Sequence, residues 1–134
     1  MVQVHLLDAE KSLSRQAVFV WAPASHGNVG NIAVDIAVST FRSRICYVGC
    51  IESDLVMPMT GYCDVTGVDI LGKPIEIYEY RSDNGSSEVP IYFIQQRAPC
   101  LRGQAKMFSR EMVSLLCGSA KDELHCGVLL IATG

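Results

Sequence analysis

The sequence predicts an α/β fold, with three αβα layers and a mostly parallel (mixed) central sheet, in a single α/β domain over residues 1–134. The first observation is the continuous apolar run at residues 17–22, which is typical of a strand buried on both faces. The second is the helical spacing of apolar residues at 29–41. The third is the short apolar run at 45–50, which completes a strand, helix, strand unit. We expect its two strands to be parallel and its connection to be right-handed.

The first predicted helix follows a turn of small residues at 25–28. Ser25 or Asn28 is expected to cap this helix, and Gly30 to allow close contact with the sheet. Two further valines lie outside the predicted stripe, so the helix is apolar over much of its circumference. The residues at helical spacing, which the pattern predicts to form its buried stripe, are Val29, Ile32, Ala33, Ile36, Ala37 and Phe41.

The middle of the chain predicts an irregular segment followed by a hairpin. Residues 51–74 contain several glycines and prolines, so at most a short helical turn is expected there. Residues 75–80 and 89–94 read as two strands joined by a polar turn. Pro90 indicates a strand start or an edge position, because proline cannot donate to a ladder.

The last third of the chain predicts one helix and one strand. Apolar residues from about Cys100 to Cys117 alternate steps of four and three, and Gly118 is expected to end that helix. Residues 126–132 form a final apolar run. Two helices about 10 Å wide would cover roughly four of the ten faces of five strands. We therefore expect the fold to be incomplete at its C-terminus and its sheet to be covered by another subunit as well. The alternative is that some of the predicted strands lie outside the main sheet.

Composition excludes several functional classes. The chain is 49% hydrophobic and 19% charged, with a formal net charge of −3 and no basic stripe, so neither nucleic acid nor a membrane surface is an expected partner. The first residues lack a secretory signal and no 18-residue apolar run occurs, so a cytoplasmic and nuclear location is expected. The six cysteines are expected to be reduced. Cys46 and Cys50 are expected on one face of a strand, not as a metal pair.

One pattern favours an enzyme. The turn from Ser25 to Gly30 joins a strand to a helix, and Glu52 follows about twenty residues later, as in a dinucleotide site. However, Ser25 stands where that fingerprint has its first glycine. A tight turn that only shapes the fold remains the alternative interpretation. No other catalytic arrangement is supported, and we expect no catalytic residue, cofactor or metal.

Three stretches carry a resemblance to a known family. Residues 27–40 (GNVGNIAVDIAVST), 47–49 (YVG) and 54–61 (DLVMPMTG) resemble the corresponding stretches of the proteasome assembly chaperone 2 family. From residue 75 onward only the order of elements matches, with a helix beginning at Pro99 and Cys100.

The resemblance implies a non-catalytic, three-layer α/β chaperone without a cofactor. It implies pairing with a related assembly chaperone as a heterodimer, and docking on proteasome α-subunits to promote assembly of the α-ring of the 20S particle. Two alternatives remain open: a nucleotide-binding α/β enzyme that uses the Ser25 to Gly30 turn, and a self-associating domain that forms a homodimer in isolation. The residues expected to contact a partner are Gly27, Asn28, Val29, Gly30, Asn31, Leu55, Val56, Met57, Pro58 and Met59.

Overall fold

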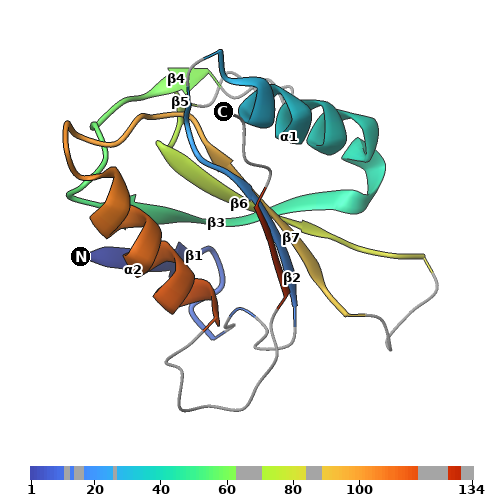
Figure 1. Cartoon of the computed structure of the whole chain (residues 1–134). Coiled ribbons are helices and arrows are strands. Elements are labelled where there is room, and N and C mark those ends of the chain that lie inside the picture. Colours follow the sequence, from blue (N-terminus) through green and yellow to red (C-terminus); the bar gives the residue numbers. More distant parts are fainter. Residues whose placement is uncertain are drawn as a thin grey trace.

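The computed structural model describes residues 1–10, 13, 17–25, 27–62, 71–83, 89–117 and 127–130. Within them, six strands form one sheet in the order β1-β3-β6-β7-β2-β8, and α1 and α2 pack against it (Figure 1). A separate two-stranded ribbon pairs β4 with β5. The elements are β1 (Val2–Leu6), β2 (Val18–Ala22), α1 (Val29–Thr40), a 3-10 turn (Arg42–Arg44), β3 (Ile45–Ser53), β4 (Gly61–Tyr62), β5 (Leu71–Gly72), β6 (Ile75–Tyr80), β7 (Ile91–Gln96), α2 (Ala105–Cys117) and β8 (Gly127–Leu130).

The sheet lies between two hydrophobic cores, which confirms the three-layer α/β class. On one face α2 buries Phe108, Met112 and Leu116 against sheet residues that include Trp21 and Ile94. On the other face, α1 packs over β2 and β7. Its residues Val34 and Val38 meet Ala22 and Tyr78, in a second and smaller cluster.

The strand directions are mixed, as predicted. β2 pairs in parallel with β7 and β8, whereas the pairs β1–β3, β3–β6 and β6–β7 are antiparallel. These pairings make β2, β3, β7 and β8 run in one direction, although most neighbouring pairs in the described sheet are antiparallel. The predicted hairpin of β6 and β7 is confirmed, with Pro90 just before β7. Strands β2 and β3 are parallel in direction as expected, but β6 and β7 lie between them.

The predicted buried stripe of α1 is wrong. The helix buries Gly30, Asn31, Val34 and Val38, whereas Val29, Ile32, Ile36 and Phe41 are exposed. Ala33 and Ala37 lie at the boundary between the two faces. Because α1 is apolar nearly all round, spacing alone could not determine which side meets the sheet.

The second helix begins five residues later than predicted. Cys100 forms an antiparallel bridge with Val56, and the Leu101 amide donates to the Leu55 carbonyl at 2.8 Å. Gly103 then takes a φ of 78°, which a right-handed helix does not allow. The helical spacing of apolar residues therefore begins at residues that are not yet in the helix. Gly118, the predicted end of this helix, lies outside the described residues.

Strand β3 contains an irregularity between Tyr47 and Gly49, where the register with β6 shifts. Tyr47 packs in the α1 core, and Ile51 packs in the α2 core, although the two are four residues apart. A regular strand would place them on the same face, so a bulge reverses the alternation. Cys46 and Cys50 consequently lie on opposite faces, which corrects the expectation that they share one.

Strand β1 was not predicted. The alternation of Val2, Val4 and Leu6 with two polar residues was its signal. It pairs antiparallel with β3 and adds a sixth strand at one edge of the sheet. None of the helices in the described part of the chain has the length and apolar character needed to cross a membrane.

Candidate protein-binding surfaces

The outward face of α1 carries an exposed apolar stripe, which we call the α1 surface: Val29, Ile32 and Ile36. Their exposed fractions are 60%, 52% and 60%. These residues recur at steps of three and four, so they line one side of the helix, opposite Val34 and Val38. An amphipathic surface helix would carry polar residues there. The stripe is therefore a candidate contact for another protein.

The turn before α1 holds the first group of predicted partner residues. Gly27 and Asn28 both have positive φ, at 76° and 51°, and both are exposed. Asn28 occupies the N-cap position without a side-chain capping bond, so the predicted cap by its side chain is wrong. Gly30 and Asn31 are buried. Of this group, Gly27, Asn28 and Val29 are accessible to a partner.

The 54–60 loop holds the second group. Leu55 and Val56 are buried, because the chain from Pro99 to Leu101 pairs with this segment. The Met57 amide donates to the Pro99 carbonyl at 3.0 Å. Met57, Pro58 and Met59 project outward and are exposed. Backbone bonds thus anchor the loop and leave three apolar side chains accessible.

These exposed side chains line one side of an open groove of about 600 Å³. Residues at the end of β3, at the start of β6 and at the amino terminus line the remainder. Its charged side chains are Glu52, Asp54 and Lys73. Lys73 Nζ lies 3.8 Å from Glu52 Oε1, and His5 Nε2 lies 3.3 Å from Glu52 Oε2. Methionine side chains adapt to varied partners, so an apolar protein segment is a suitable occupant.

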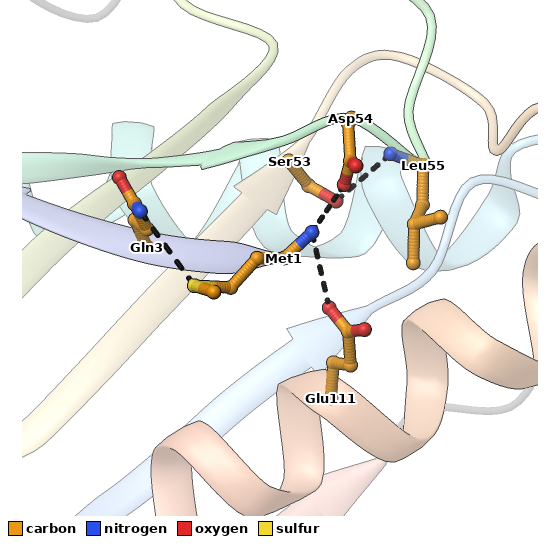
Figure 2. Close-up of polar contacts among 6 residues, drawn as sticks. All are labelled: Met1, Gln3, Ser53, Asp54, Leu55 and Glu111. Carbon is orange, nitrogen blue, oxygen red and sulfur yellow. Dashed lines mark hydrogen bonds and ion pairs between the residues drawn. The ribbon is translucent and has the colours of Figure 1, made fainter.

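The amino terminus also lines the groove, and Figure 2 shows its polar contacts. The Met1 ammonium donates to Asp54 and lies 3.8 Å from Glu111 Oε2 on α2. The bond from the ammonium lowers the pKa of Asp54, and the same bond raises the pKa of the Met1 ammonium. Ser53 Oγ accepts a bond from the Leu55 amide at 3.1 Å, which starts the loop. Sequence patterns gave no sign that residue 1 meets residue 54.

The two predicted regions lie at the same end of the sheet but are separated. The turn follows β2, the loop follows β3, and these strands run in the same direction. Strands β7 and β6 lie between them, which is about 14 Å for three strand spacings. A partner must be broad to contact both.

The same strand order argues against the dinucleotide interpretation. In a dinucleotide site, the acidic residue follows the strand next to the one that carries the glycine turn. Here Glu52 lies within β3, not beyond it, and its carboxylate lies within 4 Å of His5 and Lys73. The structure therefore does not bring the Ser25 to Gly30 turn and Glu52 together as that site requires.

Two buried polar side chains, Gln96 and Glu76, have hydrogen-bond partners within the fold. Trp21 Nε1 donates to Gln96 Oε1 at 3.0 Å, and Gln96 Nε2 donates to the Ala98 carbonyl at 3.0 Å. Glu76 accepts from the Tyr78 hydroxyl at 2.8 Å and from the Lys73 amide at 3.0 Å. The Trp21 bond links β2 to β7, and the other three are local bonds within or beside β6 and β7.

The buried thiols are poor nucleophiles. Burial raises the pKa of the Cys50 and Cys100 thiols, which reduces the thiolate fraction of each. Within the described residues, no group of three or more histidine, cysteine or acidic side chains could hold a metal ion.

Comparison with known proteins relates the chain to an assembly chaperone. No protein-family model matches the chain. Over 99 residues, or 71% of its length, the chain is 31% identical to proteasome assembly chaperone 2 of Danio rerio. The chain is similar to an assembly chaperone. It spans about a third (35%) of that relative's length. This likeness supports, at the level of the family, the resemblance carried by residues 27–40 and 54–61.

The structure adds residues that the sequence interpretation missed. Ile32 and Ile36 were assigned to the core and instead dominate the α1 surface. Lys73 lines the groove, together with Glu52, which the sequence pattern had suggested only for a dinucleotide site. The apolar character of α1 on all sides was the available signal for the first pair. The ten predicted contact residues stay a prediction, with Gly30, Asn31, Leu55 and Val56 buried.

Proposed function

We propose that this protein is a non-catalytic chaperone that acts in proteasome assembly. The observation that carries the proposal is the 31% identity to proteasome assembly chaperone 2 over 71% of the chain. The proposal includes pairing with a related assembly chaperone and promotion of α-ring assembly in the 20S particle. It also places the protein in the cytoplasm and nucleus.

The exposed apolar residues support a protein partner in preference to a small substrate. The α1 surface presents three aliphatic side chains, and the 54–60 loop presents two methionines and a proline. Interface cores are enriched in apolar and methionine side chains and depleted of charge. We propose that the related chaperone covers the α1 surface, because loss of that much exposed aliphatic area favours association.

Co-expression with the related chaperone tests the proposal. We expect a stoichiometric complex on size-exclusion chromatography. Ile32→Gln combined with Ile36→Gln should weaken it at least about tenfold, because two exposed aliphatic side chains no longer contribute their burial. Glutamine is a good helix former, so α1 should remain intact.

The matched control introduces two glutamines on α2, four residues apart as on α1. Arg110→Gln with Ser114→Gln changes two exposed positions there and should leave the complex unchanged. No complex from the unaltered chain, or equal effects of both variant pairs, would contradict the proposal. A complex that the α1 variants leave intact would retain the chaperone function but reject α1 as its surface.

A further inference from the structure

Strand β1 is the outermost described strand on its side of the sheet. It pairs with β3 in an antiparallel register that sets His5 opposite Cys50. Beyond the strand, the Leu7 amide continues the ladder by donating to the Val48 carbonyl at 2.9 Å. Along an antiparallel strand, every second residue hydrogen-bonds to the neighbouring strand. Leu7, His5 and Gln3 therefore direct their backbone N–H and C=O groups toward β3.

The backbone groups of Val2, Val4 and Leu6 consequently point away from the sheet. Among the described residues, none pairs with them. The strand VQVHL also lacks the usual protection of an edge, since it contains no proline, lysine or bulge. As far as the described part of the chain shows, three donors and three acceptors are thus available to another strand.

We infer that β1 binds β1 of a second copy of this chain, antiparallel, about a two-fold axis at Val4. In this register Val4 faces Val4, Val2 faces Leu6 and Gln3 faces His5 of the other copy. All three outward residues of each strand then form bonded pairs, which makes six interchain hydrogen bonds. A shift by one residue would pair outward groups with inward ones, and a shift by two would leave outward groups unpaired.

Side-chain chemistry selects a second copy over an unrelated strand. In the proposed register, aliphatic residues meet aliphatic residues on the face that α2 covers, and Gln3 meets His5 on the polar face. Opposed side chains of like character stabilise antiparallel pairs. The sequence of β1 is therefore complementary to itself.

The ends of the strand supply further contacts. The register places Met1 opposite Leu7 of the other copy, and these side chains are 74% and 72% exposed in the single chain. Met107 lies one helical turn before Glu111, whose carboxylate approaches Met1, so this exposed methionine faces the same edge. Pairing would remove these apolar side chains from water. The inference does not depend on the proposed chaperone function.

Sedimentation velocity of the full chain over a range of concentrations tests the inference. We expect a reversible dimer, and Val4→Pro should raise its dissociation constant at least about tenfold, because both central interchain bonds need the Val4 N–H. That N–H makes no bond to β3, so proline at this edge position should leave the fold intact. Val4→Ile is the matched control and should dimerise like the unaltered chain.

A charge exchange tests the register. Gln3→Lys with His5→Lys places two like-charged pairs across the two-fold axis and should abolish the dimer. Gln3→Lys with His5→Glu places opposite charges in the same positions and should restore it. Far-UV circular dichroism confirms that each variant is folded. A chain that stays monomeric at about 0.1 mM, a dimer that tolerates Val4→Pro, or equal behaviour of the two charge variants would overturn the inference.

Discussion

At the scale of single residues, Gly49 shows most clearly how closely two strands approach. It lies opposite Leu6 in the β1–β3 pair, next to the irregularity in β3. A Cβ atom at this position would lie 2.3 Å from the His5 carbonyl oxygen and 2.9 Å from the Leu6 Cα. Both neighbours are backbone atoms, so the strands would have to separate. Glycine is therefore required here by space, not by its dihedral angles.

Gly49→Ala should lower the free energy of unfolding by about 2 kcal/mol or more, because overpacking forces backbone shifts. Urea denaturation measures the change. Gly103→Ala provides the comparison, since Gly103 has a φ of 78° but no atom within 4 Å of an added Cβ. It should cost about 1 kcal/mol, from strain alone. A larger loss for Gly103→Ala than for Gly49→Ala would contradict this account.

Cysteine reactivity should follow burial. At neutral pH, iodoacetamide should alkylate the exposed Cys46 at least about tenfold faster than Cys50 or Cys100, whose burial raises the pKa of each thiol. Mass spectrometry of the native protein over time measures the three rates. In denaturant the rates should become similar. Faster labelling of Cys50 or Cys100 than of Cys46 in the native protein would show that the thiols are not protected.

At the scale of elements, the sequence pattern predicts that α1 is a helix, but packing determines which of its faces is buried. The helix itself follows from its apolar residues between a glycine-containing turn and Phe41. Its orientation does not, because both of its faces are aliphatic. Contact with β2 and β7 selects the Val34 and Val38 side and leaves Ile32 and Ile36 outward.

Two truncations distinguish the faces of α1. Val34→Ala should destabilise the fold by about 2 kcal/mol, because Val34 is 1% exposed and its loss leaves a cavity. Ile36→Ala should change stability by less than about 0.5 kcal/mol, because this side chain is 60% exposed. Thermal and urea unfolding measure both. The reverse ranking would support the stripe predicted from sequence.

At the scale of the whole molecule, strand order decides which loops can act together. The β6–β7 hairpin is inserted between β3 and β2. It separates the Ser25 to Gly30 turn from Glu52 and leaves the 54–60 loop beside the amino terminus instead. In its described residues, the chain therefore presents the α1 surface, the apolar side chains of the 54–60 loop and the outer edge of β1.

Nucleotides should not stabilise this arrangement. At about 1 mM ATP or NAD, the midpoint of thermal unfolding should change by less than about 1 °C, since a ligand stabilises only through binding to the folded state. Differential scanning fluorimetry measures the midpoint, with buffer matched in ionic strength as the control. A saturable rise of several degrees would revive the dinucleotide interpretation.

Features that depend on neighbouring residues were predicted from the sequence, whereas features that depend on contacts between distant residues were not. The class, both helices, the hairpin and most strands of the main sheet came from local apolar periodicity and turn residues. The start of α2 was misplaced because Cys100 pairs with Val56, 44 residues earlier. In the candidate site, the accessible Met57, Pro58 and Met59 were identified, whereas Ile32 and Ile36 were assigned to the core.

Residues close together in the chain determine the kinds of element, their order and the apolar character of α1. The tertiary structure, in contrast, sets the face that α1 buries, the position of β1 and the bulge that separates Cys46 from Cys50. It also decided the distance between Ser25 and Glu52. Each of these depends on pairing between distant segments, which local patterns do not encode.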